Sequence, residues 1–345
     1  MRIVKNNKRI SVLGLIKFLA AIAIVYFHVF PEGHWSHLWL LVEMFFFITG
    51  YFTFKHFRKK ENRGKTAEQK SKNAISYTAK KFLPLIPFVL VAIAIKYTAL
   101  ILRNDGASLP SIFKILPLDI LLLNSQTSEL NWPLWYLSAM LIVSPLFCYM
   151  CQTKQKHTLY IILFTSVITY YFNFFNGATD YLGCLIRAFF GMSTGILIYA
   201  FSREIRKHYK LKKESIILFM ITLLCMLVSI LCLYPSKENN GYSIYGTLYM
   251  IFTVIWMSIL LSGRTILSRI SSPFLNYLER LSMVIYMVHV PIFHILCLPI
   301  LPFTLSKGQL LIVTIMFSIT LGVLLSKLVA KISARPVVVP LNIST

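Results

Sequence analysis

The chain has 345 residues, of which 57% are hydrophobic and only 14% are charged, and its formal net charge is +23. A soluble globular domain carries about 25% charged residues, so this composition excludes an ordinary soluble protein. Apolar stretches recur along the whole length, each long enough to cross a bilayer core of about 30 Å as a helix. The composition predicts an all-α, polytopic helical bundle that forms one integral membrane domain over residues 1–345.

The apolar stretches predict ten transmembrane helices between about residues 12 and 330. We place them at residues 12–30, 38–56, 82–102, 132–151, 158–175, 180–200, 214–233, 244–262, 281–301 and 308–330. A further apolar piece at 112–123 is short and is interrupted by Pro117 and Asp119, which favours a re-entrant or interfacial segment. The longest polar connection, about 57–81, is rich in lysine.

Basic residues are distributed unequally between the two sides that these spans define. Of the 35 Lys and Arg residues, 28 lie in connections on the N-terminal side and four on the opposite side. The positive-inside rule therefore predicts that both termini are cytoplasmic, and an even number of spans follows. We expect a multi-pass protein of the cell membrane, the plasma membrane of a bacterium.

The net charge has more than one interpretation. Because the cations are divided among short loops between spans, they favour orientation in the membrane and attraction to anionic lipid. Nucleic acid is not an expected partner, since no single domain gathers the charge. Recognition of a phosphorylated cytosolic ligand is the alternative that stays open.

Two short motifs resemble functional sites but are better explained by packing. Cys148 and Cys151 have CxxC spacing, yet no second Cys pair or His completes a metal site, so no metal is expected. Gly191-Met-Ser193-Thr-Gly195 matches the nucleophile elbow of serine hydrolases. It lies within an apolar span, where the same letters make a Gly-xxx-Gly face for close helix contact.

Ionisable residues inside the predicted spans are the main functional signal. A charge at the centre of a membrane helix costs about 2.5–3.5 kcal/mol on insertion scales, so such a residue usually faces a cavity or a partner. These residues are Lys17, His28, Glu43, Lys96, Arg187, His289 and His294. Lys96 could extend to the external surface, and His294 is interpreted as a packing residue.

Lys17 and His28 lie on one face of the first predicted span. Eleven residues correspond to about three turns plus 20° and to about 16 Å along a helix axis. Gly14, Ala21 and Ile24 fill the rest of that face, which is mostly small. Such a face suits close helix packing or the wall of a narrow conduit.

Glu43 enters the second predicted span at about the depth of His28, and a short connection joins the two helices. We therefore expect a carboxylate–imidazole pair, in which the acid orients a general base. A structural pair of buried polar groups is the alternative. Arg187 and His289 fall nearer the middle of the membrane, so the ionisable residues together predict a polar column.

Five segments occur in an order that is typical of one known family. They are Lys17 with His28, Glu43–Phe52 (EMFFFITGYF), Pro133–Ser138 (PLWYLS), Arg187–Gly195 (RAFFGMSTG) and Leu281–His289 (LSMVIYMVH). In this order the chain resembles the acyltransferase-3 family of membrane O-acyltransferases, from about residue 10 to 330. Two features depart from the family: Lys17 stands where an Arg is expected, and only Lys80 and Lys81 represent its cytoplasmic R-x-x-R.

The resemblance implies that the protein transfers an acyl group, often acetyl, from cytosolic acyl-CoA to an extracytoplasmic hydroxyl. Acyl-CoA is then a co-substrate, and no bound cofactor is expected. The implied acceptors are a cell-surface polysaccharide, a lipid-linked glycan or a similar molecule. A homodimer stays open as the oligomeric state.

The resemblance also suggests roles for individual residues. His28, oriented by Glu43, would act as general base, and a covalent acyl-histidine relay is the open alternative. Arg187 or Lys17 would stabilise the oxyanion or the donor. His289 would complete the polar column as a donor- or substrate-binding residue.

Further residues would bind the two substrates. Lys80 and Lys81 are expected to hold the phosphates of CoA as point charges. Trp135 and Tyr136, with Trp35, Trp39 and Trp132, could stack on sugar rings; the alternative for these residues is the aromatic belt at the membrane interface.

Two other functions compete with acyl transfer. A transporter or flippase of a glycan-related substrate would also need charges inside the membrane, but it would not consume acyl-CoA. A non-catalytic membrane subunit of a glycan-assembly complex would keep the fold without the chemistry. The transporter leaves the ordered motifs unexplained.

Overall fold

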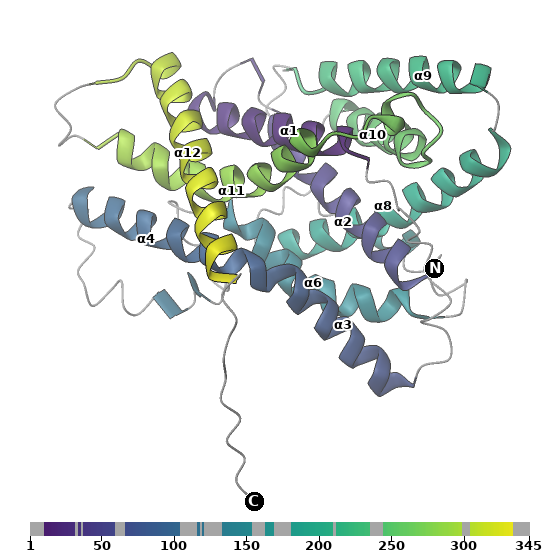
Figure 1. The fold of residues 1–345 in the computed structure, drawn as a ribbon, viewed down its shortest axis with the longest axis horizontal. Helices are drawn as coiled ribbons and strands as arrows, with labels where there is room; N and C mark the ends of the chain where they lie inside the picture. The colour runs from purple at the N-terminus through teal and green to yellow at the C-terminus, as the bar shows by residue number, and fades with distance from the viewer. Residues whose placement is uncertain are drawn as a thin grey trace, which may run out of the picture.

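The computed structural model describes residues 10–31, 34–35, 37–58, 66–103, 116–117, 119–120, 133–153, 163–168, 181–209, 212–234, 244–298 and 304–333. The long helices among them are α1 (Val12–Val29), α2 (Leu41–Phe57), α3 (Ala67–Phe82), α4 (Ile86–Arg103), α6 (Leu134–Cys151), α8 (Tyr181–His208), α9 (Lys212–Leu231), α10 (Ile244–Leu261), α11 (Pro273–Leu296) and α12 (Lys307–Ser333) (Figure 1).

Within the described residues the protein is helical, without strands, and nine of its helical segments are long and apolar enough to cross a membrane. The predicted all-α, polytopic bundle is therefore confirmed. Most of the predicted fifth span, 158–175, lies outside the described residues, which cover only a helical piece at 163–168. Most of the predicted re-entrant segment at 112–123 also lies outside them.

Helix α2 lies inside the bundle, and α9 and α12 lie at its surface (Figure 1). The apolar window of the α2 segment is 72% buried, whereas those of the α9 and α12 segments are each 28% buried. The mostly apolar side chains of α9 and α12 suit contact with lipid. The polar residues of α2 must instead find partners inside the protein.

Three glycines bring α2 and α8 into close contact. A Cβ atom at Gly50 would overlap the backbone of Met192, and one at Gly195 would overlap the backbone at Tyr51. At Gly191 the added atom would overlap the Phe46 side chain. The Gly191–Gly195 motif is therefore a helix-contact face, and the helix continues through Ser193 without the sharp turn that a nucleophile elbow requires.

Basic side chains join the C-terminal ends of several helices. Arg58, just after α2, donates to the carbonyl oxygen of Thr153, just after α6, at 3.4 Å. Arg206, near the end of α8, donates to the carbonyl oxygens of Leu261 and Ser262 at 3.1 and 2.8 Å. The ends of α2 and α6 thus meet, as do those of α8 and α10, as expected for alternating spans that end on the same side.

The structure contains helix beyond the predicted spans at three places, one of which is the end of α8, which continues to His208 and not to 200. Helix α3 occupies part of the segment that we interpreted as a polar connection, and a capping box between Thr66 and Gln69 begins it. Ala74 and Thr78 are the buried residues of α3, which packs against α6. Helix α11 begins at Pro273, eight residues before the predicted start of that span at 281.

Candidate active site

Helices α1 and α11 lie side by side and run in the same direction. A Cβ atom at Gly14 would overlap the carbonyl oxygen of Leu275, so the two backbones approach closely at their N-terminal ends. Lys17 Nζ is 2.7 Å from Glu279 Oε1, and the rings of His28 and His289 have centroids 5.1 Å apart. The two helices thus present matched polar pairs at two levels, about 15 Å apart at 1.5 Å per residue.

The pair nearer the C-terminal ends of the two helices, His28 and His289, consists of two imidazoles. His289 is fully buried, and its Nδ1 lies 3.0 Å from the carbonyl oxygen of Ile285. A carbonyl only accepts, so Nδ1 carries the proton and Nε2 of the neutral ring has a lone pair. This Nε2 is buried and has no hydrogen-bond partner among the described residues. The pair therefore contains an acceptor that a proton donor can still occupy.

The pair nearer the N-terminal ends, Lys17 and Glu279, is a partly buried ion pair. The Lys17 and Glu279 side chains are 15% and 22% exposed. Lys17 therefore keeps the position on the His28 face of α1 that the sequence predicts, but a carboxylate from α11 already compensates its charge. Any contact of Lys17 with an acyl donor must therefore form while Glu279 is paired with it, or must replace Glu279.

Glu43 lies in a second ion pair, between α2 and α8. Its carboxylate is fully buried, and Oε1 accepts from Arg187 Nε at 2.8 Å and from the Nη2 nitrogen at 2.7 Å. The guanidinium carbon lies 5.0 Å from the ring centroid of Trp39 and 4.6 Å from that of Trp135. Two aromatic faces and one carboxylate thus fix the position of this cation.

The predicted pair of Glu43 with His28 is wrong in this structure. Oε1 of Glu43 is occupied by Arg187, and Oε2 has no hydrogen-bond partner among the described residues. A buried carboxylate is compensated better by a permanent, bidentate cation than by a neutral imidazole. The sequence could not show that close α2–α8 packing brings Arg187 to Glu43.

Aromatic side chains connect the imidazole pair to the Glu43–Arg187 pair. The Tyr286 ring lies 6.1 Å from that of His289 and 5.7 Å from that of Tyr136, and Tyr136 lies 4.6 Å from Phe46. Phe46 then contacts Trp135, at 5.9 Å. The two pairs therefore belong to one continuous buried cluster.

This cluster changes the interpretation of Trp135 and Tyr136. Tyr136 is 4% exposed, and the rings of Phe46 and Tyr286 pack against it, so the structure does not offer it for stacking on a sugar. Trp135 is 8% exposed and gives one face to Arg187. Both residues shape the site from inside, because the PLWYLS segment enters α6 at its buried end.

Two other expectations concern cations near the predicted membrane surfaces. Lys96 does not extend to the surface: it is 2% exposed and its Nζ lies 2.7 Å from Asp119, which also accepts from the Tyr97 hydroxyl at 2.6 Å. Lys80 and Lys81 are exposed at the end of α3, with Lys81 Nζ 5.7 Å from the centroid of the Tyr77 ring.

The sequence reasoning gave no role to Glu279 or Tyr286, and it considered Trp39 only for stacking on sugar rings or for the aromatic belt. Glu279 was assigned to a connection, although Ser272 followed by Pro273 is a typical helix start and would have included it in the span. Tyr286 lies within the LSMVIYMVH segment and Trp39 among the aromatic residues considered above, but neither carries a charge that would have indicated a contact with the ionisable residues. His294 was interpreted as packing, and it interacts electrostatically with His28.

Comparison with known proteins assigns a family to this arrangement. A family model for acyltransferase-3, described as an acyltransferase domain, matches residues 10–330. No curated protein matches the chain, and no solved structure matches it. In the described part of the chain, no three His, Cys, Asp or Glu side chains are grouped so that they could hold a metal ion.

Proposed function

The chain belongs to the acyltransferase-3 family and is a membrane acyltransferase. On this basis we propose that it transfers an acyl group, acetyl in the first instance, from cytosolic acyl-CoA to a hydroxyl of an extracytoplasmic glycan or glycolipid. One observation carries the proposal: the His28–His289 pair contains a buried imidazole nitrogen that has no hydrogen-bond partner in the described part of the chain. A pair of neutral imidazoles is suited to moving a proton.

We assign the general base to His28. His28 is only partly buried, so a substrate can approach it, whereas His289 is fully buried behind it. In the reacting complex, Nε2 of His289 would accept the N–H of His28 and leave the other His28 nitrogen to take a proton. His289 then takes the positioning role that the sequence suggested for Glu43. Catalytic hydrogen bonds often form only in the substrate complex.

The proposed reaction balances with these groups. The acceptor hydroxyl gives its proton to His28 while its oxygen attacks the thioester carbonyl carbon. The carbon–sulfur bond breaks, CoA leaves as a thiolate, and the proton returns from His28 to that sulfur. A covalent acyl-histidine route would use the same His28 nitrogen as nucleophile in the first of two transfers.

Arg187 suits stabilisation of the negative charge that develops on the carbonyl oxygen. Its position is fixed by Glu43 and two tryptophans, so little reorganisation is needed when charge appears. Glu43 would act through Arg187 and not through His28. Lys17, paired with Glu279 about 16 Å from His28 along α1, lies too far along the axis for this oxyanion and is assigned to the donor side.

The exposed lysines at the end of α3 would bind the CoA part of the donor. Lys80 and Lys81 would hold the phosphates of CoA on the cytoplasmic side that the positive-inside rule assigns. The pantetheine arm would then pass Lys17 and reach His28. This orientation and route are parts of the proposal.

The experiment is transfer from labelled acetyl-CoA in membranes of cells that make the protein. We expect label in the glycan fraction, and its loss in His28→Ala membranes at equal protein level. His208→Ala is the matched control, because that histidine is 74% exposed at the end of α8. Glycan movement across the membrane without consumption of acetyl-CoA would overturn the proposal in favour of a transporter.

A further inference from the structure

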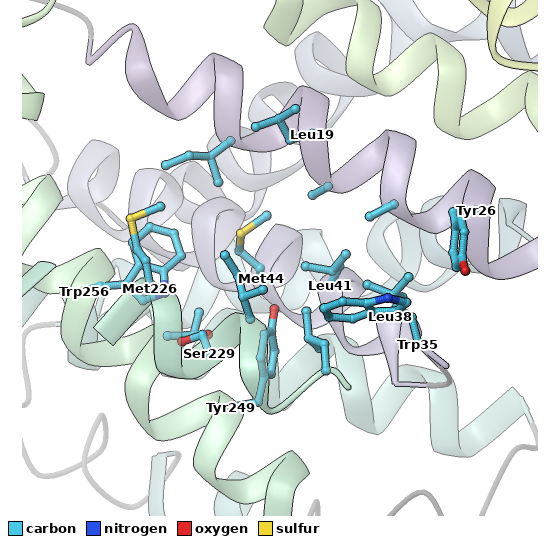
Figure 2. Close-up of a pocket in the computed structure, with 16 residues that line it drawn as sticks. Leu19, Tyr26, Trp35, Leu38, Leu41, Met44, Met226, Ser229, Tyr249 and Trp256 are labelled. Carbon is cyan, nitrogen blue, oxygen red and sulfur yellow. The ribbon is translucent and has the colours of Figure 1, made fainter. Parts of the chain in front are cut away.

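An apolar groove lies on a different side of α1 from the imidazole pair. It is formed by α1, α2, α9 and α10 and has a volume of about 420 Å³. Figure 2 shows its length: Trp256 and Met226 lie at one end, and Trp35 and Tyr26 lie at the other. Pockets of about 300–1,000 Å³ hold one drug-sized molecule, so this groove has room for one chain and not for a whole two-tailed lipid.

The lining of the groove requires no polar ligand. None of the described residues that line it is charged, and the hydroxyl groups of Ser229 and Thr253 have partners inside the protein. Ser229 donates to the carbonyl oxygen of Cys225 at 2.8 Å, and Thr253 lies 3.5 Å from the Ser229 hydroxyl. A polar ligand would lose its hydration here without replacement, whereas a hydrocarbon chain loses nothing.

The groove opens toward the lipid. Leu19 and Ile230 on its rim are 56% and 49% exposed. The lining positions on α1 extend from Ile16 to Tyr26, which is about 15 Å along the helix or half the thickness of a bilayer core. Tyr26 and Trp35 have the amphipathic rings that prefer the level of the lipid headgroups. A membrane lipid can thus enter sideways.

The groove also adjoins the candidate active site. Met44 lines it and directly follows Glu43 in α2. Tyr249, on the α10 side, lines it as well. The groove and the Glu43–Arg187 pair therefore meet at adjacent positions of α2.

From these contacts we propose that the groove binds the hydrocarbon tail of a lipid-anchored glycan, which is acylated while it is still attached to its membrane anchor. The inference rests on the proposed acyl transfer and names its acceptor class. A headgroup and glycan lie between such a tail and the reacting hydroxyl, so they can pass over the end of α1, which stops at Val29, one residue after His28.

The acyl chain of a long-chain donor fits this groove less well. That chain begins at the reacting carbonyl carbon, beside His28. Residues 26 and 28 of a helix point about 200° apart, so the body of α1 separates the chain's starting point from the groove. A donor chain would have to pass through the helix or double back around its end.

The test is photolabelling of the full-length protein in phosphatidylcholine nanodiscs. The probe is dodecyl maltoside with a diazirine in its tail, at trace mole fraction, and labelled positions are mapped by mass spectrometry. We expect label concentrated on the groove residues of α1 and α9. Ala23→Phe, which fills the groove, should lower this labelling at least about tenfold, the scale of one misplaced group in an apolar pocket.

The matched control is Ala94→Phe, which adds the same group at an exposed position of α4 and should label like the unmodified protein. Equal labelling by diazirine phosphatidylcholine would overturn the inference in favour of bulk lipid. Preferential labelling by a diazirine dodecanoyl-CoA would overturn it in favour of the donor chain. Labelling needs no acyl transfer, so transfer without labelling contradicts only the groove, and labelling without transfer contradicts only the proposed function.

Discussion

The α2–α8 contact and the α1–α11 contact treat buried polar groups in opposite ways. Between α2 and α8, the Glu43 carboxylate meets the permanent charge of Arg187, which two tryptophans hold in place. Between α1 and α11, the imidazoles of His28 and His289 face each other, and one buried nitrogen has no hydrogen-bond partner among the described residues.

This difference indicates a division of work. A compensated ion pair is costly to disturb and keeps its geometry, so it suits positioning and a fixed electrostatic field. A neutral imidazole with an unoccupied nitrogen can gain or lose a proton during a reaction. Breaking the first contact should therefore lower both stability and rate, and breaking the second should lower mainly the rate.

The largest expected effect is on the rate, at His289. If its Nε2 accepts from His28, His289→Ala should lower acyl transfer by about 10²- to 10⁴-fold, the usual contribution of positioned acid–base groups. His289→Gln, whose amide oxygen can still accept, should recover part of the rate. Initial rates at saturating acetyl-CoA measure both. Equal rates for the two variants would leave His289 with a packing role only.

The next effect is on stability, at Arg187. Arg187→Met leaves the buried Glu43 carboxylate without its cation and should lower the unfolding free energy by about 3–5 kcal/mol. The double variant with Glu43→Gln should regain most of that loss but not the activity. Denaturation in detergent and transfer assays measure the two quantities separately. Activity recovered together with stability would contradict an electrostatic role.

A smaller stability effect is expected at the α2–α8 contact. Gly50→Ala places a Cβ atom against the Met192 backbone and should cost about 1–3 kcal/mol, as overpacking usually does. Gly308→Ala is the control, because a Cβ atom there meets nothing within 4 Å. Thermal denaturation in detergent compares them. Equal denaturation midpoints for the two variants would show that α2 and α8 can move apart without loss of stability.

The smallest effect is expected at the partly exposed Lys17–Glu279 pair. Such pairs contribute about 0–1 kcal/mol, so Lys17→Met should change stability little. Its effect should appear instead as a raised KM for acetyl-CoA, which Lys17→Arg would avoid. Kinetics with varied acetyl-CoA test this. A change in kcat at unchanged KM would contradict a role of Lys17 in donor binding and would indicate a role in the reaction step.

Much of the fold could be predicted from the sequence because a bilayer imposes lengths and hydropathy on each helix. The structure also has the predicted α1 face of small residues with Lys17 and His28, because helical spacing alone defines it. The pairing of these residues could not be predicted. It depends on α11 lying beside α1, 260 residues later in the chain, with Glu279 and His289 at matching levels.

The pairing of Glu43 shows the same restriction. Hydropathy and topology gave its depth, and the shortest connection suggested His28 as the partner. The close approach of α2 and α8 at Gly50 and Gly191 selects Arg187 instead. The Gly-xxx-Gly motif was visible in the sequence, but it did not say which helix it would contact.

The central claim is that His28 carries out acyl transfer to a surface glycan. Mass spectrometry of surface glycans, from cells that make His28→Ala or the matched His208→Ala protein at equal levels, tests it most directly. We predict that the acyl group is missing with His28→Ala and present with His208→Ala. Full acylation in the His28→Ala cells would contradict the claim.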